Sequence, residues 1–246
     1  MNATQPKHQN GRPQEYRGPL TAAQIAEGMN AARRNARRLA TDARILLEAE
    51  RLPTAAAMAA LSIEESGKTS ILRELATATS PDAIKAAWRR YRDHRSKNGA
   101  WILPDLARAG AKHLFELRPT VDRNGEHTAL LNSLKQLGFY TDCYGNRHWS
   151  EPIKIFEGKE ESLAYYLVKT AELLARDEET TVREIELWIE HMQPVWLTAE
   201  MPHALLRFAE AMHRERLSTT TQQEYAQFVF GELQASEQNA GPSEDH

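Results

Sequence analysis

The sequence contains almost no cysteine and no long apolar run. Cys143 is the single cysteine in 246 residues. One cysteine forms neither an intrachain disulfide nor a cysteine metal cluster, which fits a reducing compartment. No apolar run approaches the roughly 20 residues needed to cross a bilayer, and the N-terminus lacks the apolar core of a signal peptide. These absences predict a cytoplasmic protein that has no membrane partner.

Motifs for nucleotide and metal binding are also incomplete. Gly67, Lys68 and Thr69 match the second half of a phosphate-binding loop, but Ser62 stands where that motif requires its first glycine. The preceding segment is alanine-rich and predicts a helix instead of the required strand. The histidines lack close metal-binding spacings such as H-x-x-x-H. We therefore expect neither a metal nor another cofactor. The histidines considered are His113, His127, His148, His191, His203 and His213.

Positive charge is concentrated in two segments, although the formal net charge is −3. The first segment contains Arg33, Arg34, Arg37, Arg38 and Arg44. The second contains Lys85, Arg89, Arg90, Arg92, Arg95 and Lys97. Local basic patches attract phosphate even when the whole chain is acidic. For the first segment we favour a solvated helix face, because charge runs usually lie on such faces.

Apolar residues recur at steps of three and four through most of the chain, and this spacing predicts an all-α bundle with short loops. Residues 139–150 are the exception, because aromatic and β-branched residues around a Tyr-Gly-Asn turn favour an extended or hairpin-like connection. Helices are expected at 21–50, 53–77, 82–97, 105–117, 126–138, 161–176, 181–192, 198–217 and 221–233.

Composition divides the chain into four parts. Residues 1–20 are polar and rich in proline and glycine, and we expect a disordered arm. Residues 21–155 are expected to form the helical core and residues 156–234 a helical extension packed on it. Residues 235–246 are polar and acidic, and we expect a disordered tail.

The second helix carries two charges on an apolar stripe. The stripe contains Leu61, Glu64, Lys68, Ile71 and Leu75. Glu64 and Lys68 are spaced for an i,i+4 ion pair. If the stripe is buried, each charge needs a partner, because an unpaired buried ion is costly; the alternative is a partly exposed pair. Gly67 costs about 1 kcal/mol relative to alanine inside a helix. Such a cost is typical of a position where another backbone comes close.

The third helix places a histidine with apolar residues. Ile84, Ala87, Tyr91 and His94 are spaced by three and four, so we expect His94 to point with the apolar face. Taken alone, such a histidine is more often a core residue than a catalyst. The surrounding cations make it less ordinary, because they provide charge for binding an anion.

These segments resemble the AbiV-type abortive-infection proteins, which carry a HEPN domain. The resemblance lies in two motifs in order: Glu-Glu-x-Gly-Lys at residues 64–68 at the end of an alanine-rich helix, and Arg-x-His-x-x-Lys at residues 92–97. The segments "NARRLATDARILLEAERLPTAAAM" and "LKQLGFYTDCYGNRHWSEP" are also similar to that family. The resemblance covers about residues 25–155. It implies an α-helical HEPN bundle, an expected homodimer and a role in antiphage defence.

Many HEPN proteins are metal-independent ribonucleases with an Arg-x(4–6)-His motif, and the resemblance implies the same chemistry here. Arg89 and His94 match that spacing. By analogy, His94 would move a proton of the RNA 2′-hydroxyl or of the leaving oxygen, and Arg89 would stabilise charge on phosphorus. Arg90 and Arg92 remain alternatives to Arg89. The residues expected to support catalysis or bind RNA are Arg90, Arg92, Lys97, Glu64 and Lys68.

A rival hypothesis belongs to another class of function. In it, the protein is a non-catalytic helical dimer that binds a phage or host protein, and the polar stripe serves that interface. RNA is the expected substrate under the first hypothesis, and a phage-encoded protein is the expected activator or target. Three aromatic residues are relevant to both hypotheses, because exposed rings could bind RNA bases or a partner protein: Tyr140, Tyr144 and Trp149. We favour packing of these aromatics against the bundle over base stacking.

Overall fold

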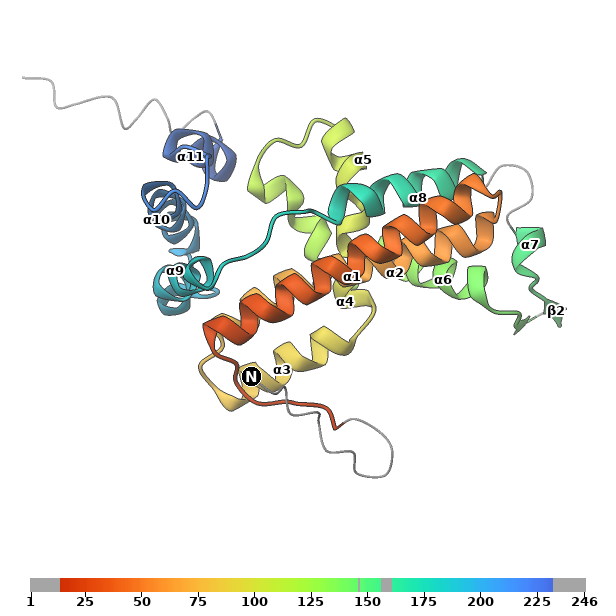
Figure 1. Ribbon diagram of the computed structural model, residues 1–246, viewed down its shortest axis with the longest axis horizontal. Helices are drawn as coiled ribbons and strands as arrows, with labels where there is room; N and C mark the ends of the chain where they lie inside the picture. The colour runs from red at the N-terminus through yellow and green to blue at the C-terminus, as the bar shows by residue number, and fades with distance from the viewer. Residues whose placement is uncertain (1–13, 146, 156–160, 232–246) are drawn as a thin grey trace, which may run out of the picture.

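A computed structural model describes residues 14–145, 147–155 and 161–231, and it shows an all-α fold with one small hairpin (Figure 1). Among these residues, no helix is both long enough and apolar enough to cross a membrane. The helices are α1 (Ala22–Glu48), α2 (Leu52–Thr77), α3 (Pro81–Arg92), α4 (Arg95–Asn98), η1 (Gly99–Ile102), α5 (Leu103–Arg108), η2 (Leu114–Val121), α6 (Glu126–Phe139), α7 (Pro152–Ile155), α8 (Glu161–Leu174), α9 (Val182–Met192), η3 (Gln193–Val195), α10 (Met201–Arg214) and α11 (Gln222–Phe230).

The long antiparallel pair of α1 and α2 forms the spine of the molecule (Figure 1). A capping box starts α1, where the Thr21 and Gln24 side chains accept hydrogen bonds from each other's backbone N–H groups. Pro53 lies in the first turn of α2, where its missing N–H costs no helical hydrogen bond. Buried alanines along α2 allow close approach of α1, and the Ser62 hydroxyl donates to the Ala36 carbonyl across the contact at 2.8 Å.

Two apolar clusters lie along this spine. At one end, α6 and α8 pack against α1 and α2 around Ile63, Leu131 and Leu167. At the other end, α3, α9 and α10 pack around Met29 and Trp188. The predicted apolar stripe of α1 passes through both clusters, and its members from Ile25 to Ala43 are buried. The α3–α4 region and α6 therefore both pack against the pair of α1 and α2.

The expectation of one continuous helix over 82–97 is wrong, because the helix is interrupted between α3 and α4. Asp93 is extended, and its carboxylate accepts hydrogen bonds from the Ser96 N–H at 3.0 Å and the Ser96 hydroxyl at 2.6 Å. Aspartate competes with the helical backbone by making such local bonds. His94 therefore does not continue the stripe of Ile84 and Tyr91. It stands at the start of a new helical turn and is exposed.

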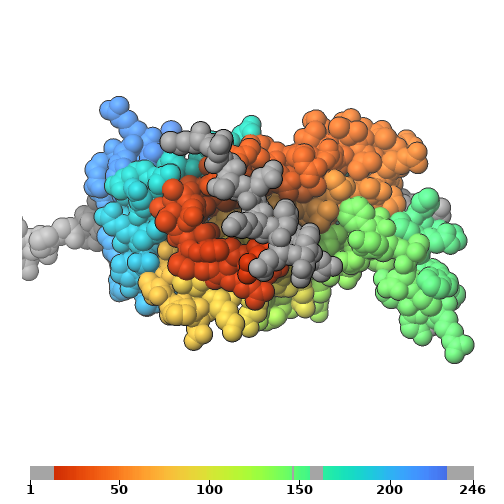
Figure 2. Space-filling model, turned by 60° about the horizontal axis from the view of Figure 1, so that its bottom comes forward, coloured from red at the N-terminus to blue at the C-terminus, as the bar shows by residue number. Residues whose placement is uncertain are grey.

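The expected helix over 105–117 is also interrupted. It forms α5 and η2, separated by a turn in which Gly110 has a φ of 95°, a conformation that glycine adopts at little cost. The predicted connection over 139–150 does contain a hairpin: β1 (Cys143–Tyr144) pairs antiparallel with β2 (His148–Trp149). This segment projects from one end of the molecule (Figures 1 and 2).

Part of the expected disordered arm has a defined position. Residues 14–20 lie against α3, where the Trp88 indole donates to the Gly18 carbonyl at 2.9 Å and the Tyr16 ring meets the Trp88 ring edge to face. The ring contact and the hydrogen bond to buried Trp88 offset the cost of ordering a polar segment. Residues 1–13 and the expected tail at 235–246 lie outside the described residues.

The arginines of α1 bind a neighbouring loop. Arg33 donates to the carbonyl of Glu178 and the hydroxyl of Thr180, and Arg37 donates to the carbonyl of Arg176. Arg34 forms an ion pair with Glu179. These contacts connect α1 to the segment between α8 and α9. The cluster thus has a structural role on the surface, which agrees with the preference for a helix face over a phosphate site.

Candidate active site

A buried glutamate lies at the centre of the candidate site. Glu64 on α2 is 4% exposed, and both oxygens of its carboxylate have partners. Its Oε2 lies 2.6 Å from Nδ1 of His94, and its Oε1 accepts a hydrogen bond from Nζ of Lys135 on α6 at 2.6 Å. The Lys135 Nζ lies 3.1 Å from the same histidine nitrogen. We call these three residues the His94 centre.

The His94 centre combines a buried base with an accessible ring. Burying a carboxylate is costly unless it is paired and hydrogen-bonded, and Lys135, itself buried, provides the countercharge. The His94 side chain is 54% exposed. In the neutral ring, a proton on Nδ1 that is donated to Glu64 leaves Nε2 unprotonated and available to bind a proton. The arrangement orients the imidazole and presents a proton acceptor at the surface.

Gly67 permits the close approach that positions His94. A Cβ atom at this residue would lie 1.8 Å from the carbonyl oxygen of Lys97 on α4. Only glycine allows α2 and the turn after His94 to meet so closely. The predicted close approach of another backbone at this position is present. It holds the start of α4 beside Glu64.

Glu64 and Lys68 do not form the ion pair that their spacing predicts. Lys68 donates instead to Glu65 at 2.6 Å and lies over the Tyr91 ring, with Nζ 5.2 Å from the centroid. Glu64 points across the helix interface to Lys135 and His94. The physical reason is burial: inside the bundle, Glu64 needs two strong donors, and α6 and the α3–α4 junction provide them.

Further positive charge surrounds the centre. Lys97 is buried, and its burial lowers the pKa of the ammonium, while the nearby Glu64 carboxylate opposes that shift. Lys68 and Lys135 also lower the pKa of Lys97 by repulsion. Three lysines therefore accompany the two carboxylates of Glu64 and Glu65. The excess cation favours an anionic ligand beside His94.

The three candidate arginines occupy different environments. Arg92 donates to the carbonyls of Trp88 and Tyr16 and pairs with Glu15. Arg90 forms an ion pair with Glu74 on α2. These contacts commit Arg92 to the N-terminal segment and Arg90 to the bundle.

Arg89 differs from both of its neighbours. It is exposed and lines a pocket of about 340 Å³ whose wall also includes Asp93 and Arg95, the chain neighbours of His94. Within the described residues, Arg89 has no ion-pair partner. Its guanidinium is thus the one of the three that is free to meet a ligand. Within the same part of the chain, no three His, Cys, Asp or Glu residues gather as a metal site would require.

Comparison with known families identifies the fold that carries this site. The family model described as AbiV, of the HEPN type, matches residues 24–176 of the chain. The chain belongs to the AbiV family. The matched segment contains the whole His94 centre, Gly67 and Arg89, whereas α9, α10 and α11 lie beyond it. Neither the curated proteins nor the solved structures yielded a match to the chain. This AbiV-family protein is accordingly a HEPN-type protein of the abortive-infection class.

Sequence reasoning missed Lys135 of this AbiV-family protein. A signal was present, because Leu131, Leu134, Lys135 and Gly138 share one face of α6 and all four are buried. A lysine on a buried apolar face requires a carboxylate partner. Glu64 was the matching residue on the second helix. Two opposite charges, each on the apolar face of a different helix, would have predicted that Glu64 and Lys135 pair.

Replacing Lys135 by methionine is expected to destabilise the protein by about 3 to 5 kcal/mol, because it leaves the buried Glu64 carboxylate without its countercharge. The double variant Lys135→Met with Glu64→Gln removes both charges and is expected to be less destabilised than Lys135→Met alone. Urea unfolding followed by circular dichroism measures both. A double variant that is less stable than Lys135→Met would contradict the pairing.

Proposed function

We propose that this AbiV-family protein is a metal-independent endoribonuclease of antiphage abortive infection, and that it acts as a homodimer on RNA. The observation that supports this most directly is the exposed His94 ring, whose Nδ1 is held by the buried Glu64 while Arg89 lies free nearby. General acid–base catalysis needs a positioned imidazole of this kind. A phage-encoded protein is proposed as its activator or target.

The proposed reaction uses the residues of the chain alone. The Nε2 atom of His94 takes the proton of a ribose 2′-hydroxyl, and the resulting oxygen attacks the adjacent phosphorus. The bond from phosphorus to the 5′-oxygen breaks, and that oxygen takes a proton from water as it leaves. The His94 imidazolium then returns its own proton to the solvent. The products are a 2′,3′-cyclic phosphate and a 5′-hydroxyl. Arg89 stabilises the additional negative charge that develops on the phosphoryl oxygens, and Lys97 and Lys68 contribute to the positive field at the centre.

The reaction is tested with purified protein and labelled RNA in EDTA. Cleavage is expected to continue in the chelator, and the products are expected to carry 2′,3′-cyclic phosphate ends, detected by mass spectrometry. A requirement for added divalent metal, or products with 5′-phosphate ends, would contradict the proposed chemistry.

Substitution of single arginines tests the assignment of Arg89. Arg89→Ala is expected to lower the cleavage rate by about 10²-fold or more, the scale of losing one donor to a developing charge. Arg92→Ala is the matched control, since it removes the same side chain three residues away, where the guanidinium contacts Tyr16 and Glu15. The rate of Arg92→Ala is expected to stay within a few-fold of wild type. Equal losses in the two variants would exclude a specific role for Arg89.

A second candidate function, binding of a partner protein, is favoured by the exposed aromatic hairpin. Trp149 is 71% exposed, and Tyr140 and Tyr144 are also exposed, so the expectation that these aromatics pack against the bundle is wrong. The hairpin is short, and its segment projects from one end of the molecule (Figure 2). Exposed aromatics of this kind are enriched where proteins bind partners.

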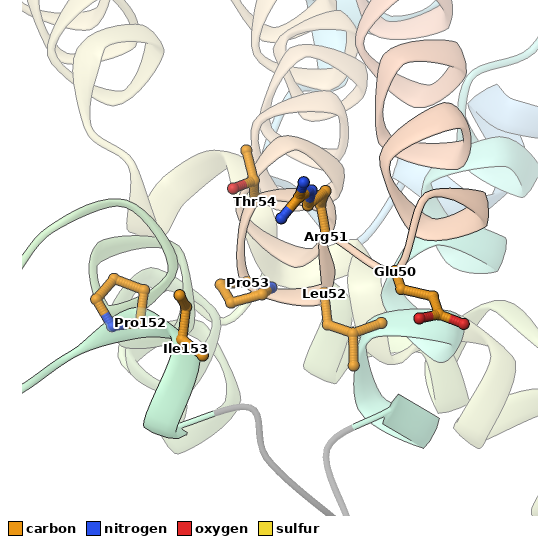
Figure 3. Close-up of a pocket in the computed structure, with 7 residues that line it drawn as sticks. All are labelled: Glu50, Arg51, Leu52, Pro53, Thr54, Pro152 and Ile153. Atoms are coloured by element: carbon orange, nitrogen blue, oxygen red, sulfur yellow. The ribbon is translucent and has the colours of Figure 1, made fainter.

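A hollow lies beside this hairpin. It has a volume of about 400 Å³ and lies where Pro152 and Ile153 of α7 face Pro53 at the start of α2 (Figure 3). The two functions separate experimentally. Protein binding at this end is expected to depend on Trp149 and not on His94.

A further inference from the structure

A second cationic feature adjoins the His94 centre. The pocket of about 340 Å³ that contains Arg89 is lined by Arg89, Arg90, Asp93, Arg95, Arg123 and Asn124. Four of these six residues are arginines, and Asp93 is the one carboxylate among them. We call it the arginine pocket. Its wall joins α3 and the start of α4 to the turn between η2 and α6, a part of the chain that sequence reasoning did not connect with the site.

The arginine pocket carries more positive charge than its own residues neutralise. The Arg90 guanidinium is balanced by Glu74 outside the lining. The Asp93 carboxylate accepts hydrogen bonds from the N–H and the hydroxyl of Ser96 and offsets one of the three remaining guanidinium charges, so two stay unbalanced within the lining. Burial lowers the pKa of Arg90, and repulsion from Arg123 lowers it further. Guanidinium groups gathered in this way favour an anion between them, and their planar donors match phosphate oxygens.

The turn that carries Arg123 has a fixed position. Buried Thr128 donates its hydroxyl to the Arg123 carbonyl at 2.9 Å, and Asp122 accepts from the Asn124 N–H at 2.9 Å. The Thr128 carbonyl in turn accepts a hydrogen bond from the Asn98 amide of α4 at 3.0 Å. Both sides of the arginine pocket are therefore attached to the same short helix. Preorganised donors of this kind bind an anion without a large ordering cost.

The position of the arginine pocket relates it to the His94 centre. Asp93 and Arg95 line it, and His94 lies between them in the chain with its ring exposed. Arg89, which the proposed reaction uses at the phosphoryl group, lines it as well. Arg123 and Asn124 are exposed, so the arginine pocket opens to solvent. Arg89 thus belongs to both features, and a strand held at Arg89 has the guanidinium groups of Arg95 and Arg123 in the same pocket.

We propose that the arginine pocket is a phosphate subsite of the RNA strand, in which Arg95 and Arg123 bind the phosphate next to the cleaved linkage. The subsite deepens the proposed ribonuclease function and rests on it. Contacts of this kind position a strand without reading its bases. Arg123 is therefore a binding residue, and its loss weakens RNA binding with little dependence on sequence.

The test measures binding of a single-stranded RNA that is 2′-O-methylated at every ribose and so cannot be cleaved through its 2′-oxygen. Fluorescence anisotropy follows its affinity for wild type and Arg123→Gln at several salt concentrations. Arg123→Gln is expected to bind about tenfold more weakly, the scale of one lost charge-assisted hydrogen bond. The plot of log affinity against log salt concentration has a negative slope. In Arg123→Gln this slope is expected to be shallower by about 0.7, the value for one single-strand phosphate contact.

Arg207→Gln is the matched control. Arg207 is exposed on α10, outside the lining of the arginine pocket, and its substitution changes the net charge by the same amount. It is expected to leave affinity and salt slope near wild type. Equal behaviour of Arg123→Gln and Arg207→Gln, or no binding by wild type, would overturn the subsite. A competition with a mononucleotide, added so that its phosphate groups match those of the RNA in number, gives a further test. Full displacement of the RNA would overturn the subsite, because the arginine pocket would then be a site for a free nucleotide.

The outcomes also separate the subsite from the ribonuclease. If unmodified RNA is cleaved but Arg123→Gln binds like wild type, the subsite is wrong and the ribonuclease stands. If Arg123→Gln loses affinity as expected but wild type does not cleave unmodified RNA, the subsite stands as a binding site and the proposed reaction is wrong.

Discussion

Replacing His94 by alanine is expected to lower the rate of RNA cleavage by about 10²- to 10⁴-fold, the usual contribution of a general acid or base. The imidazole is the proton carrier of the proposed reaction, and no other histidine contacts Glu64 among the residues that the structure describes. The rate is measured in EDTA under single-turnover conditions, so that product release does not mask the chemical step.

Two further variants make the His94 result specific. His94→Asn keeps a side-chain N–H for Glu64 but cannot exchange a proton near neutral pH, and it is expected to be as inactive as His94→Ala. It also covers the case in which the alanine variant folds poorly. His148→Ala, at an exposed histidine of β2, is the matched control and is expected to cleave like wild type. Wild-type cleavage by a folded His94→Asn would rule out the proposed catalyst.

Replacing Gly67 by alanine is expected to destabilise the protein by about 3 kcal/mol or more, as overpacking of a close backbone contact does. Alanine favours a helix over glycine by about 1 kcal/mol, but here the added Cβ would overlap the Lys97 carbonyl, which lies 1.8 Å away. The carbonyl belongs to the backbone of α4, so α4 must move. Urea unfolding gives the change in free energy.

Gly28→Ala is the control for the effect of glycine itself. Gly28 also lies inside a long helix, but a Cβ there would meet only the Leu72 side chain, with 3.4 Å to its nearest atom. This variant is expected to keep or slightly raise stability, by up to about 1 kcal/mol. If Gly67→Ala were as stable as Gly28→Ala, the close contact between α2 and α4 would not be the reason for glycine in the Glu-Glu-x-Gly-Lys motif.

The helices themselves follow from local properties of the chain. Capping boxes form at Thr21 and Thr221, and the apolar stripe of α1 is buried from Ile25 to Ala43. The turn over 139–150 forms the expected hairpin. Each of these features depends on residues within a few positions of one another, so their spacing is sufficient to predict them. The charges on the α2 stripe and Gly67 also marked where another element had to come close.

Only the tertiary structure decided which residues meet at that point. The sequence paired Glu64 with Lys68, four residues away, but the bundle pairs it with His94 and with Lys135, 71 residues away. Likewise, three arginines lie within five residues before His94, and their contacts distinguish Arg89 from Arg90 and Arg92. The spacing of residues along one helix is local geometry. Partners on different helices depend on how side chains interlock across the interfaces, which the sequence of either helix does not contain alone.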